Sequence, residues 1–287
     1  MIQNIIKKTK GNPQVKAKLH WPAIFVALLA TLVSLMVMFA VGDMDIDWDT
    51  WEPATSMMAD GGYNFGELVV PGRVIRQPWN SVSSLYYVFV GIMLIFLPYT
   101  KKASGLSITS SKAVRILFGL SAVVTGLGSA FMHMSCTFIG QIFDVVGMYL
   151  LAVFIVMYAL RNIPKFTTTL FTILYVVINA ALLYALIYAP NLRRNLFLAL
   201  ILIGLLMEYF CNRKQKGFNT DMLLAAACSL GTAYFVWQLD NHRGMFFTQT
   251  GWFQGHHLWH LGGAIACGVL YMHYNRNFKI ANPELAE

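Results

Sequence analysis

The sequence predicts an all-α integral membrane protein, and three observations support that prediction. Of the 287 residues, 57% are hydrophobic and only 12% are charged, whereas soluble domains carry about 25% charged residues. The mean hydropathy is +0.57. Eight stretches have the roughly 20 mainly apolar residues that a membrane-crossing helix needs. So few charged groups do not cover a soluble protein of this size, and the membrane class follows before any motif is considered.

Eight membrane-spanning helices are therefore expected. They run over residues 21–41, 80–98, 113–135, 141–160, 167–189, 194–211, 221–239 and 254–275. The first span follows a lysine-rich segment, as the apolar region of a signal peptide does. Its apolar run is long, however, and the residues after it do not resemble a cleavage site. We therefore interpret this span as a retained anchor.

The charges of the connecting segments predict the orientation. Residues 1–20 hold five lysines and no acid, whereas residues 42–79 hold seven acids against Arg73 and Arg76. Basic residues return after the second, fourth and sixth spans. Arg193 and Arg194 are the exception, because they fall in a short loop on the acidic side. The positive-inside rule places both termini in the cytoplasm, as an even number of spans requires.

This orientation fits a bacterial inner membrane or an ER/Golgi-type membrane. The net charge of +8 does not indicate a nucleic-acid partner, because the basic residues sit in short patches between apolar spans. Such patches set orientation in a bilayer.

Histidines inside predicted spans are the strongest functional signal, because ionisable groups in a membrane are costly and mark function by default. His256 and His260 are four residues apart, so both imidazoles lie on one helix face. His133 offers a third nitrogen from another span, at the same non-cytoplasmic end of the bundle. Three protein ligands with one open position are typical of a catalytic zinc site. We predict that these three histidines bind Zn²⁺.

Two further polar residues lie at the same depth. Ser129 precedes His133 by one helical turn, and Asp144 lies near the start of the next span. A carboxylate beside a zinc-activated water can take its proton and pass it to a leaving amine, and a hydroxyl can stabilise the oxyanion. We predict that Asp144 and Ser129 take these catalytic roles. The other histidines point elsewhere or lie near membrane boundaries and are expected to take no part: His20, His242, His257 and His273.

This set of residues, in this order, resembles the alkaline ceramidases. It also resembles the wider membrane hydrolase superfamily that contains the adiponectin receptors and Per1-type lipid-remodelling proteins. The matching pieces, over residues 80 to 260, are Asn80-Ser81-Val82-Ser83-Ser84, Ser129 with His133, Asp144, Trp237-(x)-(x)-Asp240 and His256-(x)-(x)-Trp259-His260. The resemblance adds Asn80 and Asp240 as supporting residues of the site.

The resemblance also implies a division of the chain. Residues 80–275 would form the family's seven-helix core, and residues 1–41 a basic cytoplasmic N-terminus with one extra transmembrane helix. Residues 42–79 would form an acidic non-cytoplasmic loop, and residues 276–287 a cytoplasmic tail. Residues 60–67 depart from the calcium motif that precedes the first core helix in eukaryotic alkaline ceramidases, so the resemblance does not extend to a calcium site.

The function that the resemblance implies is zinc-dependent hydrolysis of the amide bond of a membrane lipid, ceramide or a related acyl lipid. Two alternatives stay open: a receptor-like or scaffold protein with structural zinc, and a lipid esterase or acyl-remodelling enzyme. A metal-ion transporter is disfavoured, because spans 167–189 and 194–211 offer almost no polar ligands. The expected partners are the lipid substrate and the bilayer, and the oligomeric state is left open.

Overall fold

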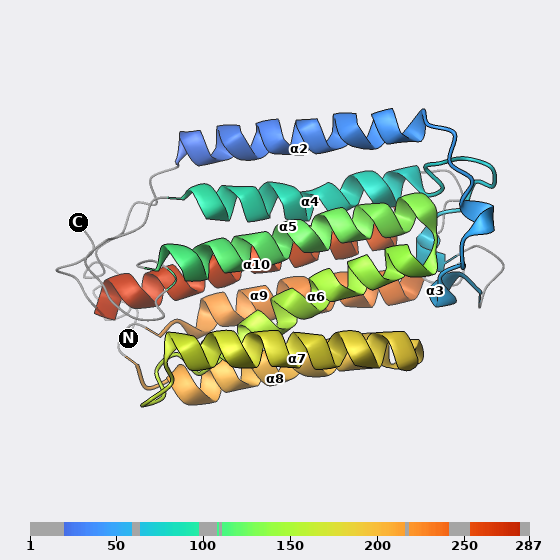
Figure 1. The fold of residues 1–287 in the computed structure, drawn as a ribbon. Coiled ribbons are helices and arrows are strands. Elements are labelled where there is room, and N and C mark those ends of the chain that lie inside the picture. The colour runs from blue at the N-terminus through green and yellow to red at the C-terminus, as the bar shows by residue number, and fades with distance from the viewer. Residues whose placement is uncertain are drawn as a thin grey trace.

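The structure is a computed structural model that describes residues 20–58, 64–97, 108, 111–215, 218–240 and 253–281, with the backbone alone for 276–281. Residues 1–19 and 282–287, which include most of the predicted basic N-terminus and half of the tail, lie outside the described residues, as does His242. Eight long helices make up the described fold (Figure 1): α2 (Trp21–Gly42), α4 (Pro78–Phe96), α5 (Lys112–Ser135), α6 (Phe138–Ala159), α7 (Thr168–Tyr188), α8 (Arg193–Asn212), α9 (Thr220–Asp240) and α10 (Gly255–Ala281).

The predicted all-α membrane fold class is confirmed. Seven of these helices begin and end within three residues of the predicted spans, and α10 extends six residues further than expected. Helices α2 and α4 to α9 are long and apolar enough to cross a membrane. Helix α10 is the eighth long helix, and its first turns carry the histidines of the predicted site. The described residues contain helices, turns and one isolated bridge between Pro53 and Thr137.

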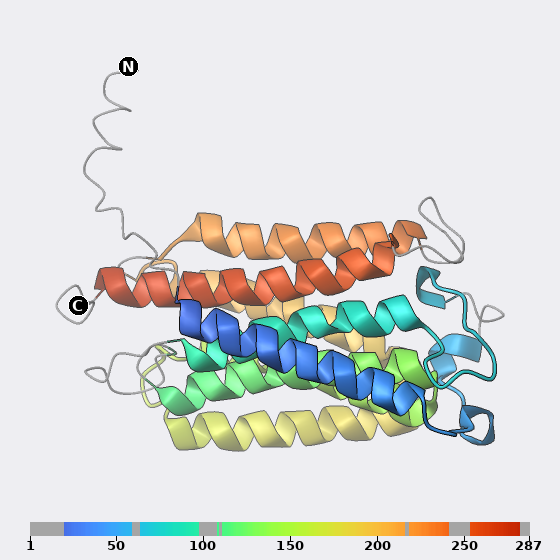
Figure 2. The same cartoon turned by 90° about the horizontal axis from the view of Figure 1, so that it is seen from above.

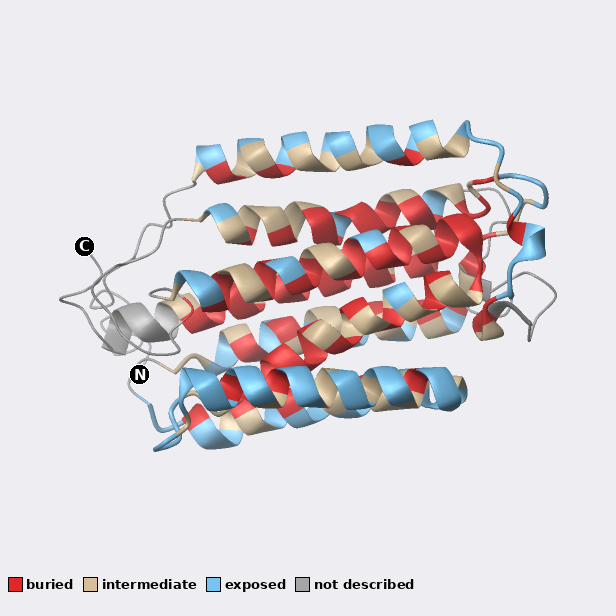
Figure 3. Ribbon diagram, viewed as in Figure 1, coloured by how far each residue is buried: buried red, intermediate tan, exposed pale blue. Residues whose placement is uncertain are grey.

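The core lies between α5 and its neighbours. Helix α5 packs against both α4 and α6, α9 packs along α10, and α10 returns to α4. Helix α2 leans on α4 at one side of the bundle, while α7 packs on α6 at the other (Figures 1 and 2). Buried residues concentrate on α5 and α6, whereas the outward faces of α2 and α7 are exposed (Figure 3). These outward faces are apolar, as helices that contact lipid must be.

The connection between α5 and α6 is only two residues long. Cys136 ends α5 in the left-handed region with φ 53°, and its backbone N–H bonds to Met132 O. Thr137 then caps α6, because its hydroxyl accepts the N–H of Gly140. This tight corner lies at the end of the bundle that carries the short helices of segment 43–77 (Figure 1).

A buried ionic network lies nearer the other end of the bundle. Arg161 donates to both carboxylate oxygens of Glu208 at 2.5 and 2.8 Å, and Asn212 donates to the same group. His273 Nε2 lies 3.1 Å from Glu208 Oε1, so the network joins α8 to α10 and to the end of α6. The expectation that α8 offers almost no polar groups therefore missed Glu208, whose charge is compensated by Arg161 rather than left for a ligand.

Gly128 lies at a close approach of α5 to α6. A Cβ atom added there would lie 2.4 Å from the carbonyl oxygen of Phe143, which as backbone cannot move aside. We expect Gly128→Ala to destabilise the fold by about 1–3 kcal/mol through overpacking, measured by thermal unfolding in detergent. Gly231→Ala is the matched control, since nothing lies within 4 Å of its added Cβ. Equal unfolding temperatures for the two variants would contradict this account of the α5–α6 contact.

Candidate metal centre

Glu67, in the described residues 64–77, holds the first turn of α4 in place from outside the helix. The Glu67 carboxylate accepts the backbone N–H groups of Trp79 and Asn80 at 2.9 and 2.8 Å. These are N–H groups that a helix cannot satisfy by itself. Pro78 begins the helix where no N–H is needed. Glu67 therefore fixes the start of α4 beside the last turn of α5, where His133 lies.

His133 is oriented by the residue just before α4. The Gln77 side-chain amide donates to the backbone carbonyl of Glu67 at 2.8 Å, so its oxygen faces the other way. That oxygen lies 2.7 Å from His133 Nδ1 and accepts its proton. The backbone of Gln77 also donates to His133 O, at 3.0 Å. Because Nδ1 of His133 carries the ring proton in this hydrogen bond, Nε2 is unprotonated and its lone pair is free.

The second helix of the site, α10, begins one residue before His256. The Asp240 carboxylate at the end of α9 accepts the backbone N–H of Gly255 at 2.5 Å. A side chain at position 255 would meet Asp240, since an added Cβ would lie 2.5 Å from its Cβ. Asp240, which the sequence places near the site, thus holds the N-terminus of the histidine helix.

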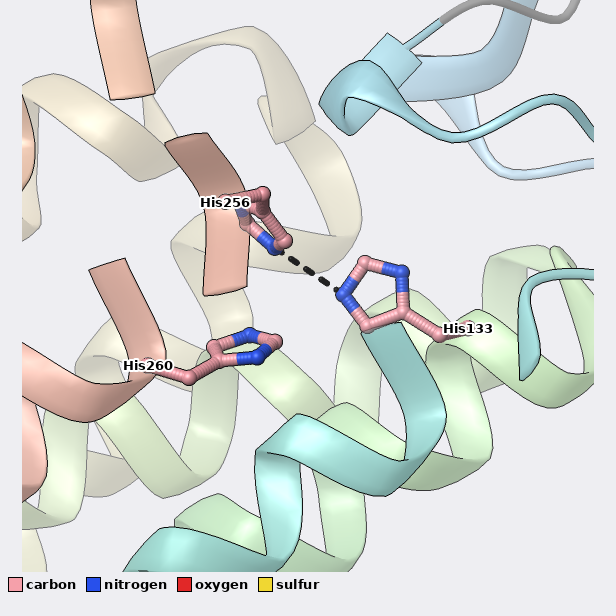
Figure 4. Close-up of side chains that lie close together, drawn as sticks. All are labelled: His133, His256 and His260. Atoms are coloured by element: carbon pink, nitrogen blue, oxygen red, sulfur yellow. Dashed lines mark hydrogen bonds between the residues drawn. The ribbon is translucent and has the colours of Figure 1, made fainter. Parts of the chain in front are cut away.

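Three imidazoles meet between α5 and α10. His256 and His260 project from successive turns of α10 toward His133 (Figure 4). His256 Nε2 lies 3.1 Å from His133 Nε2, and one nitrogen from each of the three rings falls within 4.8 Å of the others. All three side chains are buried. The structure therefore brings together the three predicted ligands from two separate helices.

The arrangement fits a zinc ion. Two nitrogens that each lie about 2.0–2.1 Å from a tetrahedral zinc are about 3.3 Å apart, close to the observed Nε2–Nε2 distance. Ser83 donates its hydroxyl to Asn80 O, so its oxygen, 2.8 Å from His260 Nδ1, accepts that ring's proton. His133 and His260 therefore both present an unprotonated Nε2, and paired Nδ1–H groups of this kind orient metal-binding imidazoles.

The predicted catalytic pair lies beside the histidines. Ser129 Oγ is 3.2 Å from His260 Nε2 and 3.1 Å from Ser84 Oγ. The carboxyl group of Asp144 on α6 lies close to the same hydroxyl. The side chain of Asp144 is partly exposed and lines the same cavity as His256 and His260. Helices α4, α5, α6 and α10 thus all contribute to one polar cluster.

Phe65 covers the histidines from segment 43–77. It is a non-glycine residue with φ 70°, a conformation that bulky residues rarely adopt. Its ring lies 5.1 Å from that of His133 and 4.7 Å from that of His256, measured between centroids. Trp237 of α9 stacks on Phe65 at 6.1 Å and also contacts His256. These two aromatic rings shield one side of the centre.

A cavity of about 340 Å³ opens beside the centre. Its apolar wall comes mainly from α6, α8 and α9 and from Trp259 of α10. Its polar residues are Thr55, Ser56, Thr125, Ser129, Gln141, Asp144, Asn191, Arg193, Arg194, His256 and His260. A space whose wall combines apolar side chains with convergent polar groups is typical of a small-molecule or lipid site.

The remaining predicted residues have structural positions. Asn80 is buried, and its carbonyl accepts the hydroxyls of Ser83 and Ser84, so it supports the site through those serines. His257 is not a member of the histidine cluster, and His20 caps α2 through a bond from Ala23 N. His273 belongs to the buried Glu208 network.

Sequence reasoning missed three residues that shape the centre: Phe65, Glu67 and Gln77. All three lie in the predicted acidic loop, outside any predicted helix. No periodicity or spacing marks such residues, although a glutamine directly before a proline-initiated helix is a signal that could have been followed.

These features define a class: a helical protein with multiple candidate membrane spans and a buried three-histidine cluster that could hold a metal ion. The comparisons then identify the family. A family model described as Ceramidase matches residues 72–282, nearly three-quarters of the sequence, and the chain belongs to that family. The search of curated proteins found no match. Membership supports a hydrolase that acts on a lipid amide, with its substrate in the membrane.

Gln77 orients one histidine of the centre, which gives a test by metal affinity. We expect Gln77→Leu to weaken Zn²⁺ binding by about 10- to 100-fold, because the His133 imidazole loses the acceptor for its Nδ1 proton. The measurement is competition with a chromophoric chelator on purified protein. Gln215→Leu, an exposed glutamine beyond the end of α8, is the control. An unchanged affinity in Gln77→Leu would show that this hydrogen bond does not orient the ligand.

Glu67 gives a pH-dependent contribution to stability. Burial raises the pKa of its carboxyl group from 4.5 to about 7, although the N–H bonds from Asn80 and Trp79 oppose the shift. The folded state therefore holds a proton that the unfolded state has lost between about pH 4.5 and 7, so stability falls as pH rises through that window. The fall is at most about 3.5 kcal/mol, at about 1.4 kcal/mol per pKa unit.

Thermal unfolding of the parent and Glu67→Gln between pH 5 and 8 tests this dependence. The stability difference between the two proteins should change with pH below about 7 and level off above it. A difference that is constant across the range would mean that Glu67 does not change its ionisation there.

Proposed function

We propose that this protein is a zinc-dependent intramembrane hydrolase that cleaves the amide bond of ceramide or a related acyl lipid. The observation that carries the proposal is the convergence of His133, His256 and His260, because His256 and His260 line one cavity with Ser129, Asp144 and a set of apolar side chains. Family membership supports the reaction class.

The metal would be held by the three histidines, with Gln77 and Ser83 as the partners that orient two of the rings. A zinc ion, when bound, lowers the pKa of a water and polarises a carbonyl. Zinc is the proposed ion because three buried imidazoles with a position left open match its catalytic sites.

Asp144 is the proposed general base and acid. It takes a proton from the attacking water and delivers it to the amine nitrogen as the C–N bond breaks, so that the products are a fatty acid and an amine. Ser129 lies close to this carboxyl group and donates to it before the proton transfer. Once Asp144 is protonated, the Ser129 hydroxyl is free to donate to the oxyanion that forms from the amide carbonyl. Phe65 and Trp237 limit access of bulk water to the histidines.

We further propose that both termini are cytoplasmic, in a bacterial inner membrane or an ER/Golgi-type membrane. The acidic segment 43–58 and the histidines lie at one end of the bundle. The basic residues that follow the C-terminal ends of α6 and α8 lie at the other end: Arg161, Lys165, Arg213 and Lys214. The positive-inside rule favours the cytoplasm for that second end. The site would then face the non-cytoplasmic leaflet, with residues 80–275 as the hydrolase core.

Turnover by an Asp144→Asn variant tests the proposal. We expect kcat for amide hydrolysis to fall by about 10²- to 10⁴-fold while bound zinc stays stoichiometric, because the carboxylate moves protons and does not bind the metal. Metal removal with a chelator should abolish hydrolysis, and added Zn²⁺ should restore it. The measurements are released fatty acid and elemental analysis of the same samples.

Asp221→Asn is the matched control, an exposed aspartate in the first turn of α9 at the opposite end from the site. Full activity of metal-free protein would refute the zinc requirement. If the metal-replete parent hydrolysed no lipid amide, yet Asp144→Asn kept normal partner binding, a receptor or scaffold with structural zinc would be favoured. Faster cleavage of the matched ester would favour an esterase.

A further inference from the structure

Two arginines occupy an unexpected place in this fold. Arg193 and Arg194 begin α8, at the end of the bundle that carries the metal centre, and both line the cavity that contains His256, His260 and Asp144. They are the exception to the alternating charge of the connecting segments. Cations in the first turn of a helix also oppose its macrodipole, at a cost of about 0.3–1 kcal/mol. Neither membrane orientation nor helix stability explains them.

Their surroundings leave them without full charge compensation. Among the described residues, neither guanidinium forms an ion pair, whereas Arg76 at the same end is paired with Asp49 at 2.5 Å. Asp144 is the sole carboxylate among the described residues that line the cavity, so the lining carries two cations and one acid. Asp144 attracts the Arg193 guanidinium, whereas Arg194 repels it. An anion between them would relieve that repulsion.

Both arginine side chains line the cavity, and neighbouring polar groups hold one of them in place. Arg193 Nη1 donates to Pro190 O at 2.8 Å and to Thr55 Oγ1 at 3.3 Å, which fixes one arm of its guanidinium against segment 43–77. Arg194 is exposed, and Asn191 lies beside the pair in the lining. The apolar lining residues of α6, α8 and α9 form the rest of the wall. The lining of the cavity therefore combines two cationic side chains, an apolar wall and two of the histidines.

We propose that Arg193 and Arg194 select an N-acyl lipid whose head group is an oxyanion, such as a phosphate, sulfonate or carboxylate, over a lipid with a neutral head group. The planar guanidinium forms paired hydrogen bonds with such groups, and charge-assisted bonds of this kind are about twice as strong as neutral ones. The acyl chain lies against the apolar wall, and the amide lies at the histidines. This inference rests on the proposed function and names the substrate class for it.

A pair of lipids that differ in the head group alone tests the inference. The metal-replete full chain in neutral detergent is assayed with an N-acyl sphingoid base and with its 1-phosphate, both with the same acyl chain. We expect kcat/KM to be at least about tenfold higher for the phosphate, mainly through KM. Arg193→Gln with Arg194→Gln should abolish that preference. Raising the salt concentration should also reduce it, because the arginines are partly solvent-exposed.

Arg213→Gln is the matched control, an exposed arginine at the opposite end of α8, and it should keep the parent's preference. Equal kcat/KM for the two lipids in the parent would overturn the inference. So would an equal loss on both lipids in the double variant, which would mean that Arg193 acts through Asp144. The inference would also be overturned if the double variant bound phosphatidylglycerol more weakly than the parent by the same factor as the phosphate lipid. Phosphatidylglycerol has no amide, so its binding would report a general anionic-lipid surface.

A binding measurement separates this inference from the reaction itself. N-alkyl analogues of the two lipids have no amide carbonyl to cleave, and Trp237 and Trp259 in the cavity wall report their binding by fluorescence. Tighter binding of the phosphate analogue, lost in the double variant, supports the head-group site even if no lipid amide is hydrolysed. Hydrolysis without any head-group preference in binding would leave the proposed function standing and overturn the inference.

Discussion

Three buried imidazoles at one end of an apolar bundle impose the main constraint on this structure. Polar nitrogens removed from water must find partners, because an unpaired buried polar group costs about 1–3 kcal/mol. Gln77 and Ser83 satisfy this need for the Nδ1 atoms of His133 and His260. Once these protons are paired, the Nε2 lone pairs of His133 and His260 remain free, and one nitrogen of each of the three rings lies within 4.8 Å of the others. The hydrogen bonds that make the rings tolerable in the interior therefore also make them suitable for binding a metal.

The acidic segment between α2 and α4 is part of this solution. Glu67 caps α4 and, through its carbonyl, directs the amide of Gln77. Phe65, in its left-handed conformation, lies on the histidine rings. Gly66 follows with φ 71°, and a Cβ there would lie 2.8 Å from Asp240 Oδ2. The segment is thus fitted between the start of α4 and the end of α9.

The bundle separates two polar clusters with a hydrophobic middle. The histidine centre lies at one end, and the Arg161–Glu208 pair with His273 lies toward the other. The second cluster is internally compensated, because a carboxylate held by a bidentate arginine needs no further charge. The first has unprotonated nitrogens that face inward and a cavity beside them. That difference makes one cluster a candidate for chemistry and the other a connection between helices.

The sequence by itself determined the helices, since apolar runs of about 20 residues have no alternative to a helix in a bilayer. It also determined the identity of the histidine set, because the spacing of His256 and His260 places them on one helix face and His133 has the matching depth. Only the tertiary structure decided the partners of these rings. Gln77, Glu67 and Phe65 lie in irregular chain, where no repeat predicts direction, and their roles depend on how segment 43–77 packs over α5 and α10. Hydrogen-bond partners distant in sequence are set by packing, whereas spans and helix faces are set by local hydrophobicity and period.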